Sequence, residues 1–232
     1  VGALTTDAYD GVKIVTSNYS TAEKVSMLEE IAQAYSDRRL TAIIPNTVYL
    51  SPAGTDVLVD GSYAAVCVAG LYAINDPAKS LSLEVVPGIS RISGSNSQFT
   101  NTQLRALTSS GILILTQSSP LVSPVIRFEV TTDVSNKKVQ QRSFTRIVDS
   151  LAKALRNTLN GILGRDRMTD EFLNKANVAL SSVLERFVRL GRITDYIIND
   201  FGVSATDVTA LAVAITATIP NVGNNIDITL VV

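Results

Sequence analysis

The sequence contains no histidine and no tryptophan, and its only cysteine is Cys67. Without histidine, the chain lacks the usual general base, the commonest ligand for transition metals and any catalytic triad built on imidazole. One cysteine cannot form an internal disulfide, and one cysteine without histidine argues against a zinc site. Cys67 stands in the apolar run AAVCVAGL, so we interpret it as a small buried hydrophobic residue rather than a nucleophile.

Sequence motifs that bind phosphate or activate a nucleophile are also missing. The chain has no GxxxxGK[ST], no GxGxxG after a strand and no GxSxG. Its carboxylates are scattered singly, so their spacing suggests no acid and base pair. We therefore expect no enzyme activity and no cofactor or metal.

Charge is sparse overall and unevenly distributed. The net charge is −1, which gives no general attraction to nucleic acid or to an anionic membrane. Residues 137–192 carry twelve Lys and Arg against five Asp and Glu, a net of +7, and residues 193–232 carry four Asp and no base, a net of −4. The basic stretch is either a set of ordinary solvated helix faces or a charged contact surface.

Hydrophobic residues make up 46% of the sequence, which is typical of a globular protein. The best apolar run, 208–219, stops at Pro220 and is short of the ~20 residues that cross a bilayer, so we expect no membrane insertion. No signal peptide pattern is present. Because the sequence begins with Val1, we expect a processed product or a fragment.

The first half of the sequence predicts an α/β domain with a parallel sheet. A short strand at 12–16, a helix beginning with the capping box Ser20-Thr21-Ala22-Glu23 and ending at Arg38 and Arg39, and a strand at 40–45 form a β-α-β unit. Beyond it we predict a loop at 51–62, a buried helix at 62–75, a strand at 82–88, a loop at 89–99, a helix at 102–110 capped by Gly111, and a strand at 111–117. Pro120 and Pro124 suggest a junction between a domain at 1–120 and another at 121–232.

The second half predicts a strand at 123–133, two amphipathic helices and a series of strands. Apolar residues recur at helical spacing from Phe144 to Ile162 and again from Leu173 to Val188, with Thr169 capping the second helix and Gly191 ending it. Strands are expected at 195–201 and 207–219. The closing segment alternates in polarity and places Ile226, Ile228, Leu230 and Val232 on one face.

A strand at the end of the chain needs a partner, because an unpaired strand edge is a template for another chain. We therefore predict that the segment Ile226, Asp227, Ile228, Thr229, Leu230 and Val231 pairs with a neighbouring subunit. In the basic helix pair, the best candidates for contact with an acidic partner are Arg165, Arg167 and Lys175, followed by Arg156 and Lys153.

Three segments resemble the contractile tail sheath proteins of myophages and related injection machines such as R-type pyocins. They are 61–90, with VAGLYAIND and VPGIS; 104–115, with Leu107, Gly111 and Ile112; and the series from VIRFEVTT (125–132) to the closing strands. The resemblance covers roughly residues 12–232 and depends on the order of elements. The tryptophan positions typical of the family have no counterpart, and the family's long N-terminal part, with its exchanged arm, has none before Val1.

The resemblance implies an outer sheath domain, the remainder of a subtilisin-like α/β fold, at 1–120, and an inner α+β domain with an exchanged terminal strand at 121–232. It implies hexameric rings of subunits stacked helically around a tail tube protein, with a baseplate and a tail terminator at the ends. Contraction would drive the tube through the host envelope. The protein would belong to the virion, after assembly in the host cytoplasm. The alternative is an α/β enzyme or ligand-binding domain with a helical appendage, which would form a small closed oligomer.

Overall fold

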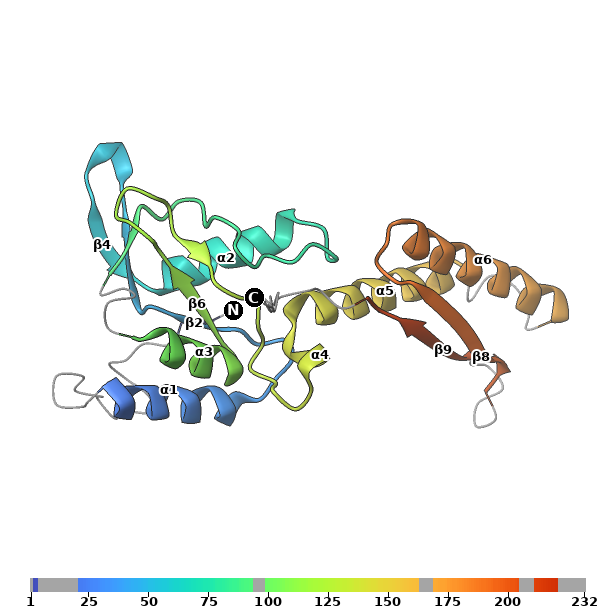
Figure 1. Ribbon diagram of the computed structural model, residues 1–232. Helices are drawn as coiled ribbons and strands as arrows, with labels where there is room; N and C mark the ends of the chain where they lie inside the picture. Colours follow the sequence, from blue (N-terminus) through green and yellow to red (C-terminus); the bar gives the residue numbers. More distant parts are fainter. Residues whose placement is uncertain (1, 4–20, 94–98, 163–168, 205–210, 221–232) are drawn as a thin grey trace, which may run out of the picture. The chain divides into compact units, whose positions relative to one another are not determined.

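The computed structural model describes residues 2–3, 21–93, 99–162, 169–204 and 211–220. The described chain divides into two compact units, the first ending at Thr145 and the second beginning at Arg146 (Figure 1). This boundary falls inside one helix, α5 (Arg142–Asn160). It lies later in the chain than the junction at Pro120 and Pro124 that the sequence suggested, because the segment after those prolines pairs with the sheet of the first unit.

The first unit is a mixed α/β structure around a four-stranded sheet in the order β1-β2-β6-β7. β1 (Gly2–Ala3), β2 (Ala42–Ile44) and β6 (Ile112–Thr116) are parallel, and β7 (Val125–Ile126) is antiparallel to β6. The strands predicted at 40–45 and 111–117 are confirmed, and they pair with each other in parallel, as a parallel sheet in this domain requires. The predicted strand at 12–16 and Ser20 of the capping box lie outside the described residues.

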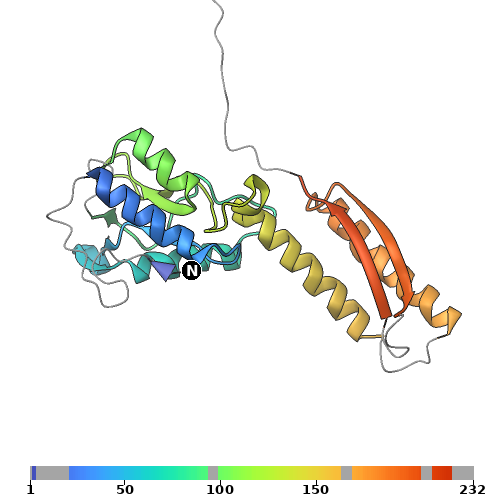
Figure 2. The same cartoon turned by 90° about the horizontal axis from the view of Figure 1, so that it is seen from below.

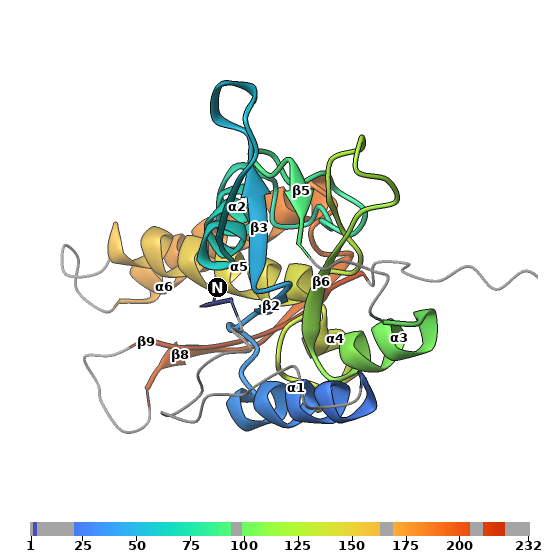
Figure 3. The same cartoon turned by 90° about the vertical axis from the view of Figure 1, so that its left-hand side faces the viewer.

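Helices cover both faces of this sheet (Figures 1 and 3). Ile112 and Ile114 of β6 pack with residues of α1 (Thr21–Tyr35) and α3 (Asn101–Ser109). Leu113 and Leu115 belong to the cluster on the other side, with α2 (Ser62–Ile74). Successive strand residues point to opposite faces, so a strand covered on both faces has to be apolar at consecutive positions, as β6 is from Ile112 to Leu115.

A second sheet in the first unit has the order β4-β3-β5. β3 (Thr47–Leu50) and β4 (Val57–Asp60) form an antiparallel hairpin around a short 3-10 turn at Pro52–Gly54, and β5 (Arg91–Ile92) pairs with β3. The predicted loop at 51–62 is therefore wrong. Pro52 and Gly54 lie in the turn, and the strand that follows them pairs with β3, a strand the sequence did not reveal.

Three further predictions about the first unit need correction. The segment 82–88 is not a strand: it contributes one isolated bridge, Val85 to Val125, and Leu83 has a left-handed φ of 63° that interrupts extended structure. The strand predicted at 123–133 is reduced to Val125–Ile126. The first helix ends at Tyr35, before Arg38 and Arg39, because Ser36 has a φ of 30°.

Gly111 ends α3 and brings two parts of the chain into close contact. Its φ is 91°, and a Cβ added there would lie 2.7 Å from the carbonyl oxygen of Thr131 and 2.9 Å from the Cα of Thr132. These neighbours are backbone atoms and cannot rotate away. The cap predicted at this position is confirmed, and the close approach explains why only glycine fits.

Gly111→Ala is expected to destabilise the first unit by about 2 kcal/mol or more, since it adds left-handed strain to a backbone clash. Gly70→Ala in the middle of α2 is the matched control, because a Cβ there meets nothing within 4 Å. It should stabilise the unit by ~0.5–1 kcal/mol. Urea unfolding of both variants measures the difference, and equal midpoints would contradict the packing at Gly111.

The second unit contains most of α5, α6 (Asp170–Arg189) and the two-stranded sheet of β8 (Asp195–Val203) and β9 (Leu211–Thr218). Ile147 and Leu151 of α5 are buried, as are the apolar residues on one face of α6, from Phe172 to Phe187. The two helices and two strands predicted for this part of the chain are confirmed. In the described parts of the chain, every helix is too short or too polar to cross a bilayer.

Candidate assembly surfaces

α6 is the framework of the second unit, and its ends are well defined. The hydroxyl of Thr169 accepts a hydrogen bond of 3.3 Å from the backbone N–H of Phe172, which caps the helix. Asp170 and Glu171 lie in its first turn and Arg186 and Arg189 in its last. These charges complement the helix dipole, so the two arginines have a structural reason to be basic.

The apolar stripe of α6 forms the core of this unit. Phe187 is 1% exposed, and the Arg192 guanidinium lies 5.1 Å from the centre of its ring. The backbone N–H of Arg192 donates to the carbonyl of Phe187 at 3.0 Å, and Gly191 has a φ of 66°. This left-handed ending turns the chain from α6 towards β8. The buried stripe is completed by Phe172, Ala176, Leu180, Val183 and Leu184.

The β8–β9 sheet lies alongside α6, as Figures 1 and 2 show. Its two strands pair antiparallel from Asp195 opposite Thr218 to Val203 opposite Leu211, with an irregularity between Ile198 and Asp200. Polar side chains meet on the exposed face, where the Asn199 amide donates to the Thr216 hydroxyl at 2.6 Å. Among the described residues the sheet has only these two strands, so β8 and β9 each have one edge without a partner strand.

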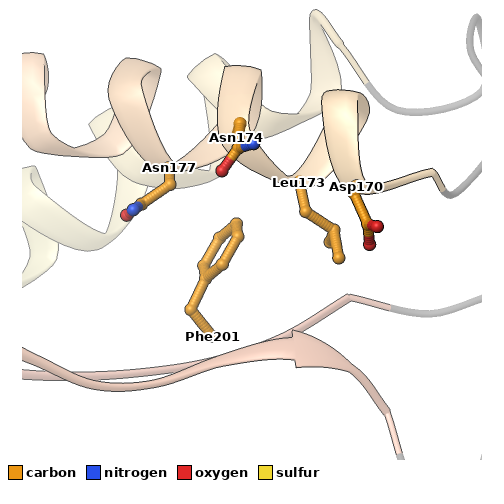
Figure 4. A pocket seen from close by; sticks show the side chains of 5 residues that line it. All are labelled: Asp170, Leu173, Asn174, Asn177 and Phe201. Atoms are coloured by element: carbon orange, nitrogen blue, oxygen red, sulfur yellow. The ribbon is translucent and has the colours of Figure 1, made fainter.

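A shallow groove of about 290 Å³ lies between α6 and β8 (Figure 4). Leu173 and Phe201 supply its apolar part, and Asp170, Asn174 and Asn177 supply amide and carboxylate groups. These side chains can accept or donate hydrogen bonds, but they include no nucleophile beside a base and no pair of carboxylates. The lining of the groove therefore offers no set of groups arranged for catalysis.

The other chemical candidates are equally weak. Burial raises the pKa of the Cys67 thiol, which is opposite to the lowered pKa of a nucleophilic cysteine. In the described parts of the chain, no three His, Cys, Asp or Glu residues gather as a metal site would require.

The structure places only some of the residues that the sequence singled out. Lys153 and Arg156 are exposed, three residues apart on one face of α5, and Lys175 is exposed on α6. Arg165, Arg167 and the closing strand Ile226 to Val231 lie outside the described residues. Of the predicted contact residues that the structure describes, Lys153 and Arg156 are therefore the two that share one exposed helix face.

The sequence analysis missed two exposed apolar surfaces of the first unit. One is the outer face of α2, which was predicted to be a buried helix, and the other is at the end of the β3–β4 hairpin. The signal for the first was present in the sequence, because Ser62–Ile74 contains no charged residue. The exposed apolar residues of the hairpin could not be recognised in the same way, because the proline, glycine and aspartate residues of 51–62 are typical of a loop.

Neither a protein-family model nor a curated protein matches the chain by sequence. Solved structures do match. A chain of the anti-feeding prophage baseplate, in a six-fold symmetrised cryo-EM structure, aligns with a TM-score of 0.68 at 12% identity over 91% of this chain. The sheath tail proteins of Desulfitobacterium hafniense and Listeria innocua align with TM-scores of 0.60 and 0.66, at 13% and 15% identity, over 94% and 95% of this chain. This chain has a tail sheath fold.

The tail sheath fold was expected from the order of elements in the sequence, and the structural match confirms that expectation. The chain covers 66% of the baseplate chain and 56% and 54% of the two sheath tail proteins. It thus spans between about half and two thirds of the length of these structures.

Proposed function

We propose that this chain is a structural subunit of a contractile tail sheath, which surrounds a tail tube and contracts to drive the tube through a host envelope. The observation that carries the proposal is the tail sheath fold over more than nine tenths of the chain. The unpaired edges of the β8–β9 sheet support it, because a sheath subunit has to connect to its neighbours.

In this proposal the α/β part is the outer domain, related to a subtilisin-like fold, and the part with the helix pair is the inner domain against the tube. Subunits form hexameric rings that stack helically between a baseplate and a tail terminator. The sheath is part of the virion and assembles in the host cytoplasm. The closing strand, Ile226 to Val231, would add to the free edge of β8 or β9 in a neighbouring subunit.

The size of the assembled protein tests this proposal. Sedimentation of the full-length protein should show large rings or tubes whose proportion rises with concentration. A small closed oligomer at every concentration is the result expected of the alternative, an α/β enzyme or ligand-binding protein, and it would contradict a sheath.

Contraction needs stored energy, and the sequence contains no GxxxxGK[ST] or similar motif for binding a nucleotide whose hydrolysis could supply that energy. The energy would therefore be stored in the assembly, as two packings of the same subunits that differ in free energy. Packed cores are not continuously deformable, so each unit would move largely as a rigid body. The exchanged strands would keep neighbours connected during the movement.

The sequence offers two candidate joints for such a movement, Pro220 to Asn225 and the loop Asp133 to Gln141. Most of the first lies outside the described residues. The second contains helix α4 (Lys137–Gln140), and the buried Gln140 side chain donates to the carbonyls of Thr108 and Ser109, both at 3.0 Å. Those bonds attach the second loop to α3 and argue against a joint at that loop.

Charge reversal at Arg165 and Arg167 is expected to weaken binding of the sheath to an acidic tube. Exposed ion pairs contribute ~0–1 kcal/mol each, so the double variant should lose roughly ten-fold in affinity at low salt and less at high salt. Arg186→Glu with Arg189→Glu is the matched control, since those arginines complement the dipole of α6. Co-sedimentation with the tube measures the effect, and unchanged co-assembly at low salt would refute this contact.

A further inference from the structure

The outer face of α2 is apolar although it is exposed. It consists of Tyr63, Val66, Gly70, Ala73 and Ile74, and the opposite face, with Ala64, Ala65, Val68 and Leu71, is buried against the first unit. Val66 is 70% exposed and Ile74 78%. A helix that is apolar all round is normally buried on all sides. The described residues of the first unit cover only one side of α2, so the outer face of this helix is suited to being covered in an assembly.

Gly70 supports the same conclusion by a separate argument. Glycine within a helix is unfavourable compared with alanine. A Cβ at Gly70 would meet nothing within 4 Å, so packing inside the subunit does not require glycine there. The absence of a side chain at the centre of the α2 outer face allows another chain to approach the backbone closely.

The first unit also presents an apolar projection, which we call the hairpin patch: Val57, Leu58, Leu121 and Val122. Leu121 is 96% exposed, and the other three are about half exposed. The hairpin projects from the body of the first unit in Figure 3.

Hydrogen bonds hold the two parts of the hairpin patch together. The Gln117 amide donates to the carbonyls of Val122 and Ser90, at 2.6 and 3.1 Å. The Ser90 hydroxyl donates to Asp56, the residue before Val57, at 2.9 Å. Asp56 also pairs with Arg91 at 3.5 Å, so the carboxylate beside the patch already has a cation.

We propose that the hairpin patch of one subunit binds the outer face of α2 in a second copy of the chain. Both surfaces are apolar, and the segment that forms α2 carries no charge, so neither needs a charged partner. Each subunit offers both surfaces, and such a head-to-tail contact closes into a ring when its rotation fits. The prophage baseplate chain with this fold comes from a six-fold symmetrised assembly. This inference rests on the proposed function, because it names a contact between sheath subunits.

Charge substitutions test the contact. Val66→Glu or Leu58→Glu should raise the concentration needed for assembly by at least about 10-fold, because each places a carboxylate in an apolar contact. Val178→Glu on α6 is the matched control, since Val178 is also 70% exposed on a helix, and it should assemble like the wild type. Gly70→Ala should raise the melting temperature by about 2 °C and still weaken assembly, a combination that a purely structural role of Gly70 does not give.

Cross-linking identifies the occupant of the α2 outer face. In a Cys67→Ala background, V66C and L58C proteins are prepared separately, mixed and oxidised. We expect disulfide-linked pairs in the mixture and none in either protein alone. Pairs in V66C alone would mean that two α2 faces meet, and no linked pairs would mean that another surface covers the face; both results overturn the proposal.

The outcome for this contact is separable from that for the proposed function. If the wild type forms large particles and V66E forms them equally well, or if V178E is as defective as V66E, the contact is wrong and the sheath proposal stands. If the wild type forms only small closed oligomers, the sheath proposal itself fails.

Discussion

Deletion of residues 225–232 is expected to leave a folded protein that does not assemble. The removed segment holds the alternating strand from Ile226 to Val231. Pairing it with a free strand edge would form about five backbone hydrogen bonds worth ~1 kcal/mol net each. Burial of Ile226, Ile228 and Leu230 would add ~1.5–3 kcal/mol per side chain. A loss of several kcal/mol per joint abolishes assembly at ordinary concentrations.

A matched pair of variants separates strand exchange from a general effect of the tail. Serine in place of Ile226, Ile228 and Leu230 changes one face of the strand, and serine in place of Asp227 and Thr229 changes the other. The first variant should behave like the deletion, and the second should still assemble. Electron microscopy gives the result, and tubes formed by the deleted protein would refute strand exchange.

Phe187→Ala is expected to unfold the second unit while the first remains folded. Truncating a fully buried phenylalanine costs ~3–5 kcal/mol, and Phe187 also carries the stacked Arg192 at the turn towards β8. The chain divides into two compact units, so the loss should be confined to the one that contains α6. Assembly should fail as well, since the β8–β9 sheet packs on that helix.

Hydrogen exchange followed along the chain measures this effect. Amides of α6, β8 and β9 should lose protection in Phe187→Ala, whereas those of β2 and β6 should keep it. Val178→Ala on the exposed side of α6 is the control and should change stability by less than about 0.5 kcal/mol. Equal loss of protection in both units would show that they do not fold independently.

The sequence predicted those elements whose own periodicity is strong. α6 was predicted because its apolar residues recur at helical spacing over many positions and its ends carry recognisable caps. β6 was predicted because it is a short continuous run of apolar residues. The prediction for segment 82–88 failed because only Val86 enters the core of the first unit, whereas Leu83 and Val85 are exposed and the backbone turns at Leu83. Hydrophobic pattern records burial, and it gives the wrong secondary structure where tertiary contacts alone provide that burial.

The α2 segment illustrates a different limit. Its composition predicted a buried helix, and the structure confirms the helix, but the described residues cover one side of it only. A sequence does not distinguish burial inside a subunit from burial between subunits, because the physical requirement is the same. The sequence also does not show which basic residues make contacts. A lysine or arginine in solvent and one at an interface occupy the same exposed positions of a helix.

High-resolution electron microscopy of the assembled protein tests the central claim most directly. The account predicts rings or tubes in which a strand from a neighbouring subunit, Ile226 to Val231, adds to the free edge of β8 or β9. Particles in which both edges stay unpaired, or a small closed oligomer with no repeating contact, would contradict it.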